Sequence, residues 1–93
     1  MKTKINDWDA SEVLDSQEMI TAYMQEALES GDQEIILTAI ADIAKAQGMT
    51  EIAKKSGLSR QNLYRALSPS ADPKFSTVQK VVEALGCRLS VVN

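Results

Sequence analysis

The sequence lacks histidine altogether and contains a single cysteine, Cys87. Without histidine, the chain has no imidazole for acid–base catalysis or for binding a metal ion. One cysteine cannot build a structural zinc site, and no imidazole is present to activate it as a nucleophile. A glycine-rich phosphate-binding loop is missing as well. We therefore predict that the protein is not an enzyme, and we expect no cofactor and no metal site.

Long apolar runs are also missing. No stretch approaches the roughly 18–20 apolar residues that span a bilayer. Lys2 and Lys4 precede acidic residues, whereas the basic start of a signal peptide precedes an apolar segment. The one cysteine suits a reducing compartment, because it cannot form a disulfide within the chain. These features predict a cytoplasmic protein, and its 93 residues are enough for a single domain with one modest core.

Charge is distributed unevenly along the chain, although the formal net charge is only −3. Residues 1–44 contain two basic and ten acidic residues, a net charge of −8, whereas residues 45–93 contain eight basic and three acidic residues, a net charge of +5. A basic half can attract phosphate groups while an acidic half meets a different partner. The negative average charge therefore does not exclude a nucleic acid as a partner.

Apolar residues recur at helical spacing in several stretches, which predicts an all-α fold of five helices. A first helix should run from an N-cap at Asp15 to about Glu29, with six apolar residues on one face: Met19, Ile20, Tyr23, Met24, Ala27 and Leu28. A second helix should run from a cap at Asp32 to Gln47. Its apolar stripe, formed by Ile36, Ala39, Ile40, Ile43 and Ala44, indicates a central and mostly buried helix.

The end of the chain should contain a last helix and a short strand. Ser76 and Gln79 have the spacing of a capping box that opens the helix, and Gly86 closes it. Thr3–Ile5 and Cys87–Val92 are candidates for short terminal strands.

We divide the domain into an acidic N-terminal extension and helix (1–30), a helix-turn-helix core (32–86) and a C-terminal strand (87–93).

The stretch Met49–Ser68, MTEIAKKSGLSRQNLYRALS, indicates two short helices joined by a tight turn at Gly57. Gly57 permits the left-handed backbone that ends a helix, and Ala53 is small enough to let two helices cross closely. Ser59 is placed to cap the second helix, and Leu63 contributes to its apolar side. This pattern is typical of a helix-turn-helix whose second helix enters the major groove of DNA.

The outward positions of that second helix carry residue types that read base edges. Arg60, Gln61 and Arg65 are the candidates, because arginine donates two hydrogen bonds to guanine and glutamine pairs with adenine. Contacts to the DNA backbone are assigned to Ser59, Tyr64, Lys74 and Ser76, which carry hydroxyls or a positive charge. The alternative is that these are ordinary solvated residues of an exposed helix.

One small helix-turn-helix reads too few base pairs alone, so we expect a homodimer on a palindromic operator. The last helix and Arg88–Val92 are the candidates for the dimer contact.

The run GMTEIAKKSGLSRQNLYRALS and the later run PKFSTVQKVVEALGCRLSVV resemble the Xre or λ-repressor-like helix-turn-helix domain. More narrowly, the chain resembles the HigA-like addiction module antidotes, which are antitoxins of type II toxin–antitoxin modules. This resemblance implies an antitoxin that neutralises a small RelE/ParE-type toxin and represses its own operon. Many members of the wider class open the first motif helix with a glutamine that contacts phosphate. Met49 occupies that place here, which shifts specificity toward Arg60 and Arg65.

The acidic half fits the same interpretation, because the toxins of this class are generally basic. Glu18, Glu26 and Glu29 on the first helix could steer and hold a basic toxin, although each could equally be a solvated carboxylate. A second function also stays open at this point. The protein could be a phage-type or chromosomal transcriptional repressor without a toxin partner, in which residues 1–30 merely extend the core.

Overall fold

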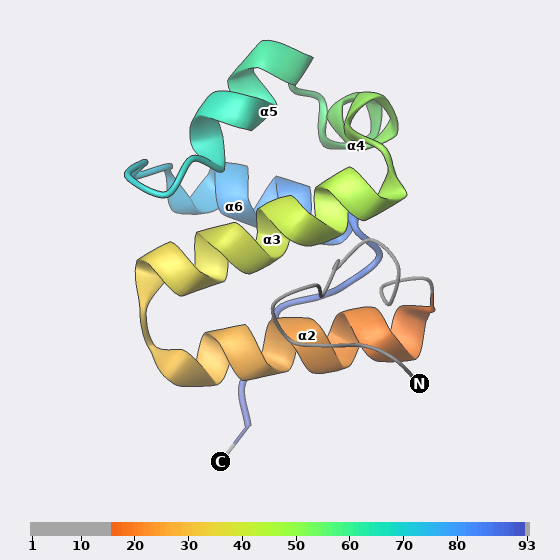
Figure 1. The fold of residues 1–93 in the computed structure, drawn as a ribbon. Coiled ribbons are helices and arrows are strands. Elements are labelled where there is room, and N and C mark those ends of the chain that lie inside the picture. Colours follow the sequence, from red (N-terminus) through yellow and green to blue (C-terminus); the bar gives the residue numbers. More distant parts are fainter. Residues whose placement is uncertain (1–15, 93) are drawn as a thin grey trace, which may run out of the picture.

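The computed structural model describes residues 16–92, and these residues form five helices and no strand (Figure 1). The helices are α2 (Gln17–Ser30), α3 (Gln33–Gln47), α4 (Met49–Ser56), α5 (Arg60–Ala66) and α6 (Phe75–Ala84). The predicted all-α fold is therefore confirmed. Within the described part of the chain, no helix is long and apolar enough to cross a membrane.

Short-range hydrogen bonds set the bounds of α2 and α3. The Asp32 carboxylate accepts a hydrogen bond from the Glu34 N–H at 2.9 Å, and Gly31 ends α2 with a left-handed backbone at φ 69°. The predicted cap at Asp32 and the predicted helix end at Gln47 are confirmed. At the start of α2, however, the Ser16 hydroxyl accepts from the Met19 N–H at 3.2 Å. The prediction that Asp15 is the N-cap is therefore wrong by one residue.

The α4–α5 pair has the arrangement of a helix-turn-helix, with the three residues 57–59 between the two helices. Gly57 has φ 80°, and its N–H donates to the Ala53 carbonyl oxygen at 3.0 Å. The Ser59 hydroxyl accepts from the Asn62 N–H at 3.0 Å and caps α5. Ala53 is buried in the core cluster. The predicted turn at Gly57 and the predicted cap at Ser59 are confirmed.

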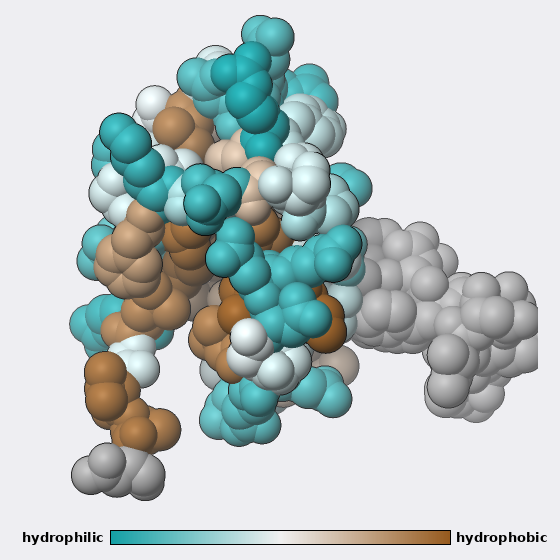
Figure 2. Space-filling view, turned by 90° about the vertical axis from the view of Figure 1, so that its left-hand side faces the viewer, coloured by the Kyte–Doolittle hydropathy of each residue, from teal (hydrophilic) through white to brown (hydrophobic). Residues whose placement is uncertain are grey.

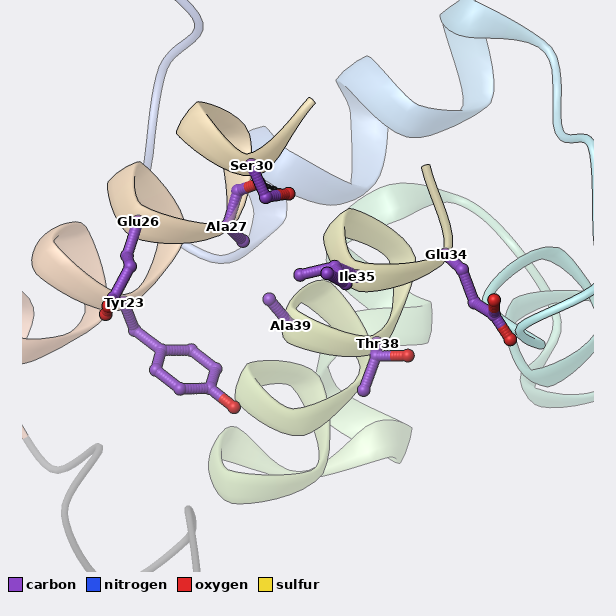
Figure 3. A pocket seen from close by; sticks show the side chains of 8 residues that line it. All are labelled: Tyr23, Glu26, Ala27, Ser30, Glu34, Ile35, Thr38 and Ala39. Atoms are coloured by element: carbon purple, nitrogen blue, oxygen red, sulfur yellow. Dashed lines mark hydrogen bonds between the residues drawn. The ribbon is translucent and has the colours of Figure 1, made fainter. Parts of the chain in front are cut away.

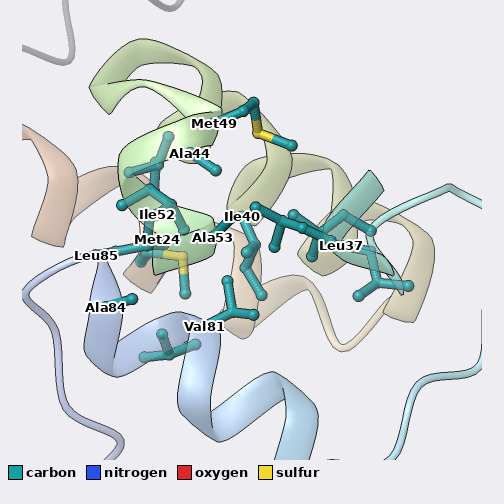
Figure 4. Packing of buried hydrophobic residues seen from close by; sticks show 14 of the residues in the cluster. Met24, Leu37, Ile40, Ala44, Met49, Ile52, Ala53, Val81, Ala84 and Leu85 are labelled. Atoms are coloured by element: carbon teal, nitrogen blue, oxygen red, sulfur yellow. The ribbon is translucent and has the colours of Figure 1, made fainter. Parts of the chain in front are cut away.

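One hydrophobic core joins all five helices, and α3 lies across its middle (Figure 1). Helix α2 packs on one side of α3, while α4 packs against α3, α5 and α6. The largest fully buried side chains are Ile40, Ile43, Ile52, Leu63, Leu85, Val81 and Val82. Figure 4 shows side chains of α3, α4 and α6 converging in this core. The core thereby fixes α5, which is only seven residues long, through Leu63 and the neighbouring Leu67.

The prediction of a C-terminal strand at Cys87–Val92 is wrong. These residues form no strand among the described part of the chain, because no second strand lies beside them to complete a ladder. Gln17 Nε2 donates to the Gly86 carbonyl oxygen at 3.2 Å, which ties the start of this tail to α2. Cys87 and Leu89 are half-buried and pack against the core, and only the end of the tail is fully exposed, with Val91 at 95% and Val92 at 86% (Figure 2). The candidate strand at Thr3–Ile5 lies outside the described residues.

Two further sequence predictions need correction. Helix α6 begins at Phe75, and Lys74 is its N-cap without a side-chain hydrogen bond, so Ser76 does not cap it and the predicted capping box is wrong. On α2, Met19 and Leu28 are 46% and 43% exposed, because α3 covers α2 from one side and buries only a narrow face. Leu37 of α3 is fully in the core, although it was not assigned to the predicted stripe.

A hydrogen bond between α2 and α3 gives the first testable prediction. The Tyr23 hydroxyl donates to Asp42 Oδ2 at 2.8 Å. Partial burial, this hydrogen bond and the charge of Asp42 raise the pKa of Tyr23 above its usual 10.0. As the pH rises above 10.0, the unfolded chain loses the Tyr23 proton while the folded chain keeps it. The contribution to stability is therefore complete below that pH and is lost as the pH rises further.

Denaturant unfolding of the wild type at about pH 8 and about pH 11 should show a lower free energy of unfolding at the higher pH. Tyr23→Phe has no proton to lose, so it should show a smaller decrease between the same two conditions. An identical decrease in both proteins would contradict this role of Tyr23.

Candidate nucleic-acid interface

Helix α5 presents its polar side to solvent at one end of the molecule. Arg60, Gln61 and Arg65 are all exposed, while Leu63 on the opposite side is completely buried. Buried and exposed residues alternate along α5 with the helical period. Because Leu63 faces the core, the three candidate base-reading side chains face outward. Hydrophilic side chains gather at this end of the molecule (Figure 2). The helix therefore offers a continuous hydrogen-bonding surface.

Arg60 is held by a residue one turn further along α5. Its guanidinium carbon lies 5.6 Å from the centroid of the Tyr64 ring, and Nη2 donates to the Tyr64 hydroxyl oxygen at 3.2 Å. An arginine above an aromatic ring gains a cation–π attraction while its remaining N–H groups stay available. Tyr64 therefore positions Arg60 before any ligand arrives, a role beyond the backbone contact predicted for it.

Arg65 is held more loosely on the same surface. Its Nη1 donates to Asn62 Oδ1 at 3.4 Å, which leaves most of its guanidinium donors free to bind. Asn62 was not among the predicted site residues, although its position three residues before Arg65 could have indicated the contact. Gln61 is exposed, and its side chain has no hydrogen bond within residues 16–92.

The two predicted contacts outside the motif lie at the beginning of α6. Lys74 is the N-cap residue of this helix and Ser76 is in its first turn, and both are exposed. A surface hollow of about 470 Å³ joins this region to α5, with Asn62, Arg65 and Thr77 among its lining residues. Asp72 also lines it, and its Oδ1 accepts from Gln33 Nε2 at 3.5 Å. The sequence did not indicate Asp72 or Thr77, because only the fold brings the loop before α6 and the first turn of α6 beside α5.

Met49 is only 7% exposed and belongs to the hydrophobic core. Its side chain therefore packs inside the domain and offers no polar atom to a phosphate group. The usual glutamine contact is therefore absent at this position, and the shift of specificity toward Arg60 and Arg65 stays a prediction. At Gly48, the N-cap residue of α4, no side chain caps the helix.

The three carboxylates predicted to meet a toxin, Glu18, Glu26 and Glu29, are all exposed on α2. Helix α2 lies on the opposite side of α3 from α5 (Figure 1). Residues 16–44 contain six acidic residues and no lysine or arginine, whereas residues 45–92 contain eight basic and three acidic residues. Helix α2, whose charged residues are all acidic, thus lies on the opposite side of α3 from α5, whose charged residues are both arginines.

Comparison with known proteins gives the family of the chain. The model of a family described as "Probable addiction module antidote protein" matches residues 4–93. An uncharacterised protein of Haemophilus influenzae is 43% identical over 91 residues, which cover 98% of this chain and 94% of that protein. No solved structure matches the chain. Since the family model spans nearly the whole sequence, the chain belongs to the addiction module antidote family.

Proposed function

We propose that this protein is a cytoplasmic, non-enzymatic antitoxin of a type II toxin–antitoxin module. It neutralises a small basic toxin of the RelE/ParE type, and it binds operator DNA as a homodimer to repress its own operon. The observation that carries the antitoxin assignment is the family match across residues 4–93. The exposed polar surface of α5, the second of two short helices joined by a tight turn, supports the assignment to DNA.

In this proposal, α5 lies in the major groove with Arg60, Gln61 and Arg65 toward the base edges. Ser59 and Tyr64 contact the DNA backbone beside them, while Lys74 and Ser76 contact it from the start of α6. The Ser59 hydroxyl accepts the capping hydrogen bond, so its own proton remains available to a phosphate oxygen.

Dimerisation would place two copies of α5 about 34 Å apart, which is one turn of DNA. We propose that α6 and the C-terminal tail form the contact between copies. Phe75 is 68% exposed, and the tail exposes Val91 and Val92 at 95% and 86%. Apolar side chains this exposed favour burial against a partner, and a second copy of the chain would supply one.

Co-expression with the adjacent gene tests the proposed function. If that gene encodes the toxin, the chain should copurify with its product, protect cells from it and shift the shared promoter in a gel. A chain that shifts the promoter but neither retains nor neutralises the neighbouring product would favour the alternative, a repressor without a toxin. Failure of both assays would contradict the proposed function altogether.

Lys74→Ala provides a narrower test of the proposed backbone contacts. Removing one phosphate contact should weaken binding to every DNA sequence to a similar extent, because phosphate contacts carry no sequence information. The slope of log K against log salt concentration should decrease by about 0.9. Titrations of operator and random duplexes at several salt concentrations provide the measurement. A loss confined to the operator would show that Lys74 reads sequence instead.

A further inference from the structure

A groove runs between α2 and α3 on the acidic side of the molecule (Figure 3). Its volume is about 570 Å³. The lining residues are Tyr23, Glu26, Ala27 and Ser30 of α2, with Glu34, Ile35, Thr38 and Ala39 of α3. This size lies within the range of about 300–1,000 Å³ of sites that hold a ligand or a few side chains. We call this feature the α2–α3 groove.

Small side chains form the floor of the groove, and the Tyr23 ring borders one end of it. Ala27 and Ala39, both buried, face each other between the helices, so neither fills the space above them (Figure 3). Ile35 lies beside them and remains 48% exposed. At the other end, the Tyr23 ring is fixed through its hydroxyl, which donates to Asp42 at 2.8 Å. The groove therefore has an apolar floor and a tyrosine held in place at one end.

The charge around the groove is of one sign. Glu26 stands on its α2 side, and Glu34 lies at the α3 end and points away from α2 (Figure 3). All six charged residues between positions 16 and 44 are acidic. An occupant would therefore gain from carrying lysine or arginine around an apolar side chain.

Charge also distinguishes a basic protein partner from three other possible occupants of the groove: residues 1–15, a second copy of the chain and DNA. Residues 1–15 of the same chain contain four acidic and two basic residues, so they carry the same sign as the groove. A symmetric contact with a second copy would bring the carboxylates of both α2–α3 faces together, since such an interface uses the same patch twice. DNA carries negative phosphates. A basic protein partner is the occupant that this surface fits.

Building on the proposed function, we propose that the α2–α3 groove is the toxin-docking site, and that it holds an apolar side chain of the toxin flanked by lysine or arginine. Glu26 meets the basic flank, and Ile35 packs against the inserted side chain. Glu18, near the beginning of α2, does not line the groove and contributes less than Glu26.

The position of the groove has a consequence for regulation. Helix α2 and helix α5 lie on opposite sides of α3 (Figure 1). A toxin bound between α2 and α3 therefore leaves the polar surface of α5 open to DNA. The antitoxin can then hold the toxin and the operator at the same time.

Ile35→Arg is the test, and Thr21→Arg is its matched control. Both substitutions add one positive charge at an exposed position, but only Ile35 lines the groove. The full-length variants are titrated with the basic protein that copurifies with the wild-type chain. Ile35→Arg should weaken this complex by about tenfold or more, while Thr21→Arg stays near the wild-type affinity. Thermal unfolding and promoter binding should be unchanged in both.

The other outcomes would overturn the proposal in distinguishable ways. Wild-type toxin affinity in Ile35→Arg would exclude the groove as the docking site but leave the antitoxin function standing. Loss of dimer in Ile35→Arg would identify the groove as a contact between copies. A lower thermal stability together with unchanged toxin affinity would indicate that residues 1–15 occupy it. If the wild type retains no basic protein, the proposed function fails and the groove proposal fails with it.

Discussion

Replacing Arg60 or Arg65 by alanine is expected to weaken operator binding by about 1–3 kcal/mol each, which is roughly 5- to 150-fold. The loss should be specific to the operator if these side chains read base edges as we propose, because their removal leaves the proposed phosphate contacts in place. Titration of each variant with an operator duplex and a random duplex of the same length provides the measurement. The ratio of the two affinities should fall in both variants.

Arg60 and Arg65 should nevertheless differ in one respect. Arg60 lies over the Tyr64 ring and donates to its hydroxyl, whereas Arg65 has only the long contact to Asn62. Tyr64→Phe keeps the ring beneath Arg60 and removes the hydroxyl, so it should cost less operator affinity than Arg60→Ala. Unchanged operator affinity in both arginine variants would rule out α5 as the element that reads DNA.

A core substitution should have the largest effect on stability. Ile40 is completely buried on α3 and lies among the converging side chains of Figure 4. Ile40→Ala should lower the free energy of unfolding by about 2–5 kcal/mol, because it removes buried methyl groups and leaves a cavity. This is a large share of the roughly 5–15 kcal/mol that stabilises a typical domain. Denaturant titration of the two proteins gives the difference.

Ile35→Ala is the control for this prediction, because it is the same chemical change on the same helix. Ile35 is 48% exposed, so its truncation should cost less than about 1 kcal/mol. The two variants should then separate by function as well as by stability. Ile35→Ala should fold like the wild type and bind the toxin more weakly. Ile40→Ala should instead have a lower free energy of unfolding. Equal losses of stability would contradict the assignment of Ile40 to the core and Ile35 to the groove.

The features that were predicted correctly from the sequence depend on residues close together in the chain. The cap at Ser59, the left-handed turn at Gly57 and the cap at Asp32 each involve residues at most four positions apart. Such local rules also place Arg60, Gln61 and Arg65 on the outer side of α5, because burial of Leu63 fixes the rotation of the helix. The exposed polar surface of α5 was therefore predictable.

The features that the sequence did not predict depend on contacts between residues far apart in the chain. Residues 87–92 have the composition of a strand, but a strand needs a partner that the single chain does not supply among its described residues. The α2–α3 groove arises because Ala27 and Ala39 face each other across two helices, and in the sequence both look like ordinary core alanines. The contact between Tyr23 and Asp42 joins residues 19 positions apart. Neither the Ala27–Ala39 pair nor the Tyr23–Asp42 pair can be predicted from the spacing of residues along one helix.

The central claim is that one small domain binds DNA through α5 and a toxin through the α2–α3 groove, on opposite sides of α3. Native mass spectrometry of the chain mixed with the basic protein from the adjacent gene and the promoter duplex tests it most directly. We expect one species that contains the antitoxin dimer, the toxin and the duplex together. Binary complexes that never combine, or a toxin that releases the chain from DNA, would contradict it.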